Sequence, residues 1–384
     1  MTFQSLNKLF FDRAEQYGEK PFLWARKEKN WESLSWSETS LKIREFAGGL
    51  KSFGIKAGDK VVIVSENRPE WIIADIAINL IGAITVPAYT TNTEDDHHYI
   101  LEHSDAKAVI ASNNILANRL ALATTRTNHC KILITLDKYS GFEPENLRII
   151  NFNEVSDFGK NTIETSLDYL NNINPDDVSC IIYTSGTGGR PKGVMLTHKN
   201  IYSNLLGAED LLEIIGKKDN KYLSLIPLSH SYEHTAGLYL QIDLGSQIYF
   251  CEGPEKFSQN LSEVSPTLTT AVPRIFEVIH DRIKIQMKNQ NFIADHLFVT
   301  AANMTQAGCE LGARVLNWST RIQGISPVYW DMNIKEDIAR ICNQGAKMLD
   351  LNLEFNSNMI NHDNNYVCLL YTSDAADERS SVDL

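Results

Sequence analysis

The chain has 384 residues and a net charge of −12, because 48 Asp and Glu residues outnumber 36 Lys and Arg residues. Hydrophobic residues make up 43% and charged residues 22%, the balance of a folded globular protein and not of a disordered one. The acidic excess argues against a broad nucleic-acid surface, which needs a cationic footprint. It leaves open a local site for a phosphorylated small molecule.

In chain order, helical patterns alternate with short β-branched runs over roughly the first 250 residues. A helix is predicted over residues 37–53, with Ser37 as its N-cap and Gly54 as its stop signal. Further helices are predicted from Thr93, where Asp96 three residues later resembles a capping box, and after Thr197. Buried strands are predicted at residues 61–64, 108–111, 131–136, 180–184, 222–226 and 247–250.

The most apolar run covers residues 71–89 and is long enough to suggest a membrane span. Asp75, Asn79 and Pro87 lie inside it, and an unpaired Asp in lipid is costly. We therefore expect a buried helix followed by a core strand. Together with the strand and helix alternation, this predicts an α/β fold of layered, parallel-rich sheets with flanking helices.

Six cysteines stand alone, without a CxxC pair or the Cys/His spacing of a zinc site. We expect reduced thiols in a reducing compartment, and hence a cytoplasmic protein. No signal peptide is expected, because Asp12, Arg13 and Glu15 interrupt the N-terminal segment before an apolar stretch forms.

The strongest chemical motif is YTSGTGGRPKGV at residues 183–194, directly after a predicted strand. Its glycines let backbone N–H groups approach an anion closely. Thr184, Ser185 and Thr187 add hydroxyl donors, and Lys192 adds a mobile positive charge. The motif is neither a Walker loop nor GxGxxG. It indicates a phosphate site; the alternative is an ordinary flexible turn between a strand and a helix.

The string YTSGTGGRPKG resembles the phosphate-loop signature of the adenylate-forming (AMP-binding) superfamily. Residues 66–89, 226–237 (IPLSHSYEHTAG) and 266–279 (PTLTTAVPRIFEVI) resemble further segments of that superfamily. The SHxxExTAG and AVPRxxExI forms are most similar to long-chain fatty acid–CoA ligases. The resemblance covers residues 1–285 and implies the large N-terminal domain of such enzymes, although incomplete.

The resemblance also implies a set of site residues. The nucleotide-binding residues would be Thr184, Ser185, Gly186, Thr187, Gly188, Gly189 and Lys192, which hold the β- and γ-phosphates of ATP, with Thr184 also helping to place Mg²⁺. Gly188 stands where the family usually has Thr, so we expect a weakened loop. No catalytic residue is assigned.

Five histidines lie in or near the segments that matter for the site or in the helix predicted from Thr93. His230 matches a position near the adenylate and the acyl entrance; the alternative is a capping or packing histidine. His234 stands where long-chain members commonly carry Arg, so an ion pair there would depend on pH. His97, His98 and His103 are expected at the surface.

The implied activity is ATP-dependent activation of a long-chain fatty acid to an acyl-adenylate and then to a thioester of coenzyme A. Its partners are the fatty acid, ATP with Mg²⁺, and coenzyme A, without nucleic acid. Two alternatives stay open, a fatty acyl-AMP or acyl-carrier-protein ligase and a non-catalytic nucleotide- or acyl-binding fragment. Peripheral membrane contact also stays open, because fatty acids partition into lipid.

We expect three segments along the chain. Residues 1–285 form a partial AMP-binding N-terminal domain, residues 286–367 form a divergent or chimeric segment with no assigned role, and residues 368–384 resemble the translation of a sequencing adaptor. A genuine acidic tail is the alternative for the last segment. The family's Tyr-Gly-x-Thr-Glu and Thr-Gly-Asp segments are not found. This chain by itself is therefore expected not to complete thioester formation.

Overall fold

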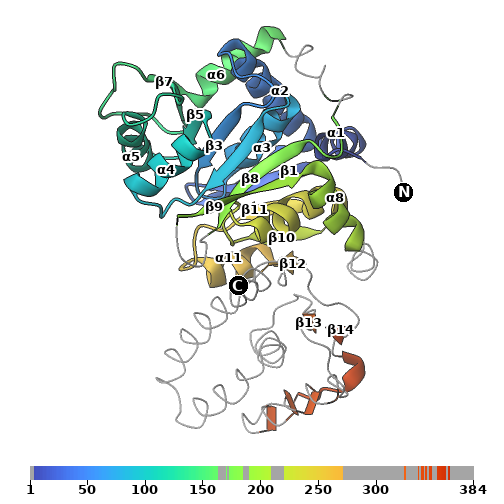
Figure 1. Ribbon diagram of the computed structural model, residues 1–384. Coiled ribbons are helices and arrows are strands. Elements are labelled where there is room, and N and C mark those ends of the chain that lie inside the picture. Colours follow the sequence, from blue (N-terminus) through green and yellow to red (C-terminus); the bar gives the residue numbers. More distant parts are fainter. Residues whose placement is uncertain are drawn as a thin grey trace, which may run out of the picture. The chain divides into compact units, whose positions relative to one another are not determined.

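The computed structural model describes residues 4–162, 170, 173–184, 190–208 and 220–270, and scattered residues between 324 and 363. The chain divides into two units, Met1–Cys251 and Glu252–Leu384. The first unit contains two sheets and the helices packed against them (Figure 1). The expected boundary at residues 285 and 286 and the tail 368–384 lie outside the described residues.

The elements of the first unit follow one another in this order: α1 (Leu6–Tyr17), β1 (Pro21–Lys27), β2 (Asn30–Ser35), α2 (Trp36–Ser52), β3 (Lys60–Val64), α3 (Pro69–Leu80), β4 (Ile84–Ala88), α4 (Glu94–His103), β5 (Ala106–Ala111), α5 (Asn114–Thr124), β6 (Ile132–Thr135), β7 (Arg148–Asn151), α6 (Phe152–Gly159), η1 (Lys160–Thr162), β8 (Val178–Thr184), β9 (Lys192–Thr197), α8 (His198–Gly207), β10 (Lys221–Ser224), η3 (Glu233–Tyr239, a π-helix), α10 (Leu240–Leu244) and β11 (Gln247–Phe250). In the second unit the described elements are α11 (Phe257–Val264), β12 (Leu268–Thr269), β13 (Gly324–Ile325), η4 (Ser357–Met359) and β14 (His362–Asp363). Strands β13 and β14 pair in parallel.

The larger sheet of the first unit has the strand order β7-β6-β5-β3-β4-β8-β9. All neighbouring pairs from β7 to β8 are parallel, and β9 alone runs antiparallel at one edge. Parallel strands covered on both faces read as continuous apolar runs, which is why β3, β4, β5, β6 and β8 of this sheet could be predicted from the sequence. The α/β fold of parallel-rich sheets with flanking helices is thereby confirmed.

The second sheet contains β10, β11, β1 and β2 from the first unit, in that order. Strands β10, β11 and β1 are parallel, whereas β1 and β2 form an antiparallel hairpin. Sequence patterning did not predict the edge strand β9, nor did it predict β1, β2 or β7. The latter three strands carry charged and polar residues on a partly exposed face, so they lack the apolar run that marks the other strands.

Helix α3 confirms the buried helix predicted at the start of the apolar run, and β4 is the core strand after it. Every residue of α3 except Glu70 is buried, and the helix contacts β1 of one sheet and β3 and β4 of the other. Burial on all sides explains the apolar character of the run. Within the described residues, no helix combines the length and apolarity needed to cross a membrane.

The N-cap of helix α2 lies two residues earlier than predicted. Its N-cap is Ser35 and not Ser37, because the Ser35 Oγ accepts from the Glu38 N–H at 3.0 Å and the Glu38 carboxylate accepts from the Ser35 N–H at 2.7 Å. This reciprocal capping box needs Glu three residues after the cap, a spacing that only Ser35 offers. The predicted stop at Gly54 is confirmed by its positive φ of 85°.

The other predicted helix starts are confirmed. Thr93 caps α4 and forms a capping box with Asp96, and Thr197 caps α8 in the same way with Asn200. The surface expectation for histidines is wrong for His97, which is buried, while His98 is half-buried and His103 is exposed. His97 lies three and four residues before Ile100 and Leu101, so it shares their inward helix face.

Candidate functional site

The glycine-rich segment closes a hairpin between two strands of the larger sheet. Thr184 at the end of β8 and Lys192 at the start of β9 are Cα partners in the antiparallel register. Thr184 is half-buried and Lys192 is exposed. Ser185, Gly186, Thr187, Gly188 and Gly189 lie between them, outside the described residues. The segment therefore leads from a strand into an antiparallel strand before α8 begins, not directly into a helix.

The position of this hairpin in the sheet is that of a ligand site. Strand β8 runs parallel to β4, so Thr184 lies at the carboxyl edge of the parallel strands. Ligands of open α/β sheets bind beyond that edge. Thr184 and Lys192 are thus brought together at the edge where a phosphate loop is expected.

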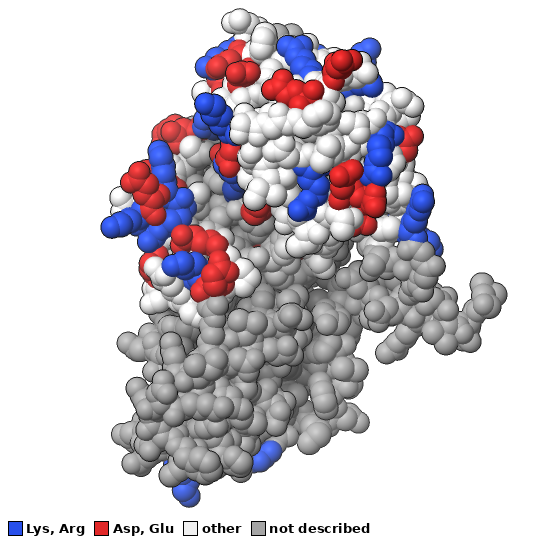
Figure 2. Space-filling view, turned by 90° about the vertical axis from the view of Figure 1, so that its left-hand side faces the viewer, with Lys and Arg blue, Asp and Glu red and all other residues white. Residues whose placement is uncertain are grey.

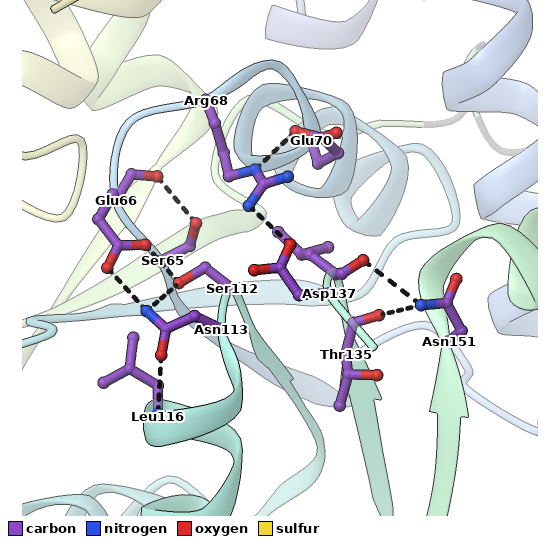
Figure 3. A network of polar contacts seen from close by, with 11 residues as sticks. Ser65, Glu66, Arg68, Glu70, Ser112, Asn113, Leu116, Thr135, Asp137 and Asn151 are labelled. Atoms are coloured by element: carbon purple, nitrogen blue, oxygen red, sulfur yellow. Dashed lines mark hydrogen bonds and ion pairs between the residues drawn. The ribbon is translucent and has the colours of Figure 1, made fainter. Parts of the chain in front are cut away.

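Further along the carboxyl edge of the larger sheet, polar side chains that follow neighbouring strands form hydrogen bonds and ion pairs with one another (Figure 3). Glu66, which follows β3, accepts hydrogen bonds from the Ser112 Oγ and, at 3.0 Å, from the Asn113 Nδ2. Ser112 and Asn113 follow β5, and Asn113 also caps α5 through a hydrogen bond from the Leu116 N–H. The Glu66 carboxylate therefore joins the ends of two neighbouring strands.

A second group in the same network involves Arg68. Its guanidinium lies 2.8 Å from the Glu70 carboxylate and 3.5 Å from that of Asp137, which follows β6. Asn151 at the end of β7 donates to the Thr135 carbonyl at 3.1 Å. Both carboxylates pair with the guanidinium, and the Asn151 amide bonds a backbone carbonyl, so this part of the edge acts as a structural brace.

Asn67 connects the two sheets at their carboxyl ends. Its Nδ2 donates to the Ser224 Oγ at 2.9 Å and to the Ile226 carbonyl at 2.7 Å, and its Oδ1 accepts from the Leu228 N–H at 2.8 Å. Ser224 ends β10, and the bonded loop leads to His230. Asn67 thus fixes the backbone that carries one of the predicted site residues.

Glu233 extends this network into the motif SHxxExTAG. Its carboxylate is fully buried and accepts from the Tyr222 hydroxyl at 2.8 Å and the Ser224 Oγ at 2.7 Å. A Cβ on Gly237 would lie 2.3 Å from the Glu233 side chain, so the glycine leaves the space that the carboxylate occupies. The sequence places Glu233 in a motif but does not indicate that its carboxylate is buried. The one local indication is that a charged residue lies next to an apolar run.

His230, the predicted substrate-side histidine, is half-buried just before η3. Its Nδ1 accepts from the Tyr232 N–H at 3.2 Å, and its carbonyl accepts from the His234 N–H at 2.9 Å. These contacts describe a histidine at the entry to a helix. Its role at the acyl entrance stays a prediction.

His234 forms the ion pair that the sequence pointed to, and its partner is Asp75 of α3. The two side chains are completely buried, with the His234 Nε2 3.1 Å from the Asp75 Oδ2. Tyr239 donates to the same Asp75 oxygen at 2.7 Å. Burial alone would lower the pKa of His234, but the charge of Asp75, the nearby Cys180 and the hydrogen bonds to both raise it to about 10. The pair stays charged at neutral pH.

His234 also links the segment 226–237 to β8, the strand that leads into the glycine-rich segment. The His234 Nδ1 lies 3.7 Å from the Cys180 Sγ in β8, four residues before Thr184. The segment at 226–237 and the glycine-rich hairpin thus meet on one strand. Asp75 was noticed as a charge inside an apolar run, but its partner lies 159 residues away, beyond the reach of any local pattern.

Comparison with known proteins identifies the class of protein. A family model described as AMP-binding enzyme matches residues 10–347, and the chain belongs to this family. The match continues past residue 285, into the segment without an assigned role.

Individual relatives are consistent with this family. The chain is 27% identical over 312 residues to fatty acyl-CoA synthetase A of Dictyostelium discoideum, covering 78% of this chain and 45% of the relative. It is equally 27% identical to the long-chain-fatty-acid–CoA ligase ACSBG1 of Homo sapiens, covering 78% and 42%. The chain thus spans less than half the length of these relatives.

A solved structure, the long-chain-fatty-acid-CoA ligase FadD1 from Archaeoglobus fulgidus, superposes with a TM-score of 0.60 at 24% identity. The superposition covers 75% of this chain and 54% of that one, and it supports the fold.

Proposed function

We propose that this chain provides the triphosphate-binding part of a long-chain fatty acid–CoA ligase. The observation that carries the proposal is the pairing of Thr184 with Lys192 across the neck of a glycine-rich hairpin at the carboxyl edge of a parallel sheet. The relatives named as acyl-CoA synthetases and ligases support the substrate class. The proposed substrates are a fatty acid, ATP and coenzyme A.

The chemistry explains why this hairpin matters. A fatty carboxylate becomes reactive when it attacks the α-phosphate of ATP and displaces pyrophosphate, a step that brings one anion onto another. Positive charge and N–H donors aimed at the phosphates lower its barrier. Lys192 is exposed at the hairpin neck, where its ammonium is free to reach the β- and γ-phosphates. The segment 185–189 would supply the N–H donors.

The described residues could hold Mg²⁺ only together with a bound nucleotide, whose phosphates would supply most of the ligands. No group of three or more His, Cys, Asp or Glu side chains in the described part could hold a metal alone. Mg²⁺ in nucleotide sites is held by substrate phosphates, waters and few protein oxygens, and bound there it shields phosphate charge. The Thr184 hydroxyl is the protein oxygen that we assign to it.

His230 is proposed to lie beside the acyl group, since the hydrogen bonds of Asn67 to Ile226 and Leu228 fix the loop that leads to it.

We place the protein in the cytoplasm, with peripheral membrane contact through a lipid-soluble substrate. Figure 2 shows acidic and basic side chains interspersed over the described part of one face, so that part offers no continuous cationic surface for nucleic acid.

The test is the dissociation constant for MgATP, measured by calorimetry on this chain and on the variant Lys192→Ala. Loss of one charged contact, about 1.5–3 kcal/mol, predicts a weakening of about tenfold or more. Lys131→Ala is the matched control, because this exposed lysine precedes β6 at the opposite, amino edge of the sheet. Unchanged affinity in Lys192→Ala would contradict the assignment of Lys192, and no saturable binding at millimolar MgATP would overturn the proposed function.

Product analysis separates the alternatives. For the intact parent enzyme, incubation with palmitate, MgATP and either coenzyme A or acyl carrier protein identifies the acceptor by which thioester forms, because this chain by itself is expected not to complete that step. Thioester on the carrier protein alone would favour the carrier-protein ligase. MgATP binding without palmitate-dependent pyrophosphate exchange would favour a nucleotide-binding fragment.

A further inference from the structure

One helix outside the predicted site holds both strands of the glycine-rich hairpin. On the exit side, the Tyr99 hydroxyl of α4 donates to the Pro191 carbonyl at 2.9 Å. The guanidinium of Arg190 lies 5.3 Å from the centre of the Tyr99 ring. Arg190 and Pro191 are the two residues that connect the segment 185–189 to β9. Tyr99 therefore fixes the backbone where the chain leaves the loop.

On the entry side, the same helix contacts the end of β8. The His103 Nδ1 lies 2.8 Å from the hydroxyl of Tyr183, the residue before Thr184. The rings of Tyr99 and His103 lie 5.2 Å apart, and Tyr99 meets Tyr183 edge to face at 6.2 Å. Three rings thus join the entry and exit of the loop to one surface of α4.

Helix α4 is a suitable anchor because it is itself well fixed. The capping box of Thr93 and Asp96 closes its first turn, and it packs against α5. Its Ile100 and Leu101 belong to the apolar core that includes Val62 of β3. Because α4 is packed against the core of the sheet, its hydrogen bond to the Pro191 carbonyl holds the neck of the hairpin in a fixed position relative to that core.

We propose that Tyr99 is a positioning residue for phosphate binding. It holds the exit of the hairpin, and with it Lys192 at the start of β9, in reach of the β- and γ-phosphates. This inference rests on the proposed function, since it assumes that the hairpin binds a triphosphate. It assigns to α4 a task that none of the sequence motifs indicated.

The test compares ligands that differ only in their outer phosphates. Tyr99→Phe removes the hydroxyl but keeps the ring beneath Arg190. We expect the dissociation constant for MgATP to rise about three- to tenfold, the effect of one lost hydrogen bond. The dissociation constant for AMP should stay unchanged, because AMP has no β- or γ-phosphate. Both constants are measured by calorimetry on the full chain.

Tyr139→Phe is the matched control. Like that of Tyr99, the Tyr139 hydroxyl has a backbone carbonyl as acceptor, that of Phe142; the Asn118 Oδ1 lies 3.2 Å away as an alternative acceptor, and both are away from the hairpin. This variant should bind both nucleotides as the unmodified chain does. Thermal melting of both variants checks that each is folded to the same extent.

Each outcome decides the matter. Selective loss of MgATP affinity in Tyr99→Phe supports the positioning role. Unchanged MgATP affinity, or an equal loss for MgATP and AMP, overturns it while leaving the proposed function intact. If the unmodified chain binds no MgATP, the proposed function fails and this inference fails with it.

Discussion

The buried pair of Asp75 and His234 gives a sharp test of how the first unit is stabilised. Asp75→Asn keeps the shape of the side chain but removes its charge. His234 then faces an apolar interior without a counter-charge and must lose its proton. The neighbouring buried His198 shows the consequence of burial, since desolvation lowers its pKa to about 4.

The structure sets the size of the effect. Two unit charges at the observed 3.1 Å attract by about 5 kcal/mol with an effective dielectric constant of about 20. Removing one partner of a buried pair typically costs about 3–5 kcal/mol. We expect Asp75→Asn to lower the free energy of unfolding by about this amount near pH 6.

The pH dependence follows from the raised pKa of His234. Because the folded-state pKa is about 10 and the ordinary value is 6.5, the contribution of His234 is complete below pH 6.5 and disappears as the pH rises to about 10. The pKa of Asp75 is lowered: burial opposes this, but His234 and Tyr239 outweigh burial. Its contribution is therefore lost only as the pH falls below about 3.8. The difference between the unmodified chain and Asp75→Asn should shrink from pH 6.5 to 10.

Urea unfolding followed by tryptophan fluorescence measures this difference, and Trp71 is a local reporter because its ring lies 5.5 Å from that of His234. Asp12→Asn is the control: it breaks the exposed pair with Lys8, which is expected to contribute less than about 1 kcal/mol. A loss below about 1 kcal/mol in Asp75→Asn at pH 6.5, or a difference that stays constant up to pH 10, would refute the reasoning.

Two further predictions concern caps and buried histidines. Ser35→Ala should lower the free energy of unfolding by about 1 kcal/mol in urea titration, because the capping box of α2 is lost. Ser37→Ala should change little, and equal losses would contradict the assignment of the cap. Burial and then the charge of Arg119 lower the pKa of His97 to about 4, so the unmodified chain should lose stability as the pH falls from 6.5 to 4. His97→Gln should reduce that loss in the same titration, and an unaltered pH profile would show that His97 does not contribute to it.

Local chemistry explains what could be predicted from the sequence. The strands β3, β5, β6 and β8 are visible because a parallel strand buried on both faces needs a continuous apolar run. Thr93 is visible as a helix start because a cap and its partner, here Asp96, lie three residues apart. The glycine-rich motif is equally local, since all of its donors lie within ten residues. The α/β class and the family resemblance rest on such short-range patterns.

The tertiary structure decided everything that depends on distant partners. Asp75 and His234 are 159 residues apart, and Asn67 and Ser224 are 157 apart. The anchoring of Pro191 by Tyr99 joins residues 92 positions apart. A buried polar residue needs a hydrogen-bonding partner wherever the fold supplies one, and no local periodicity records which residue that is. The sequence therefore reveals where the phosphate motif lies, whereas only the folded chain reveals what holds it in place.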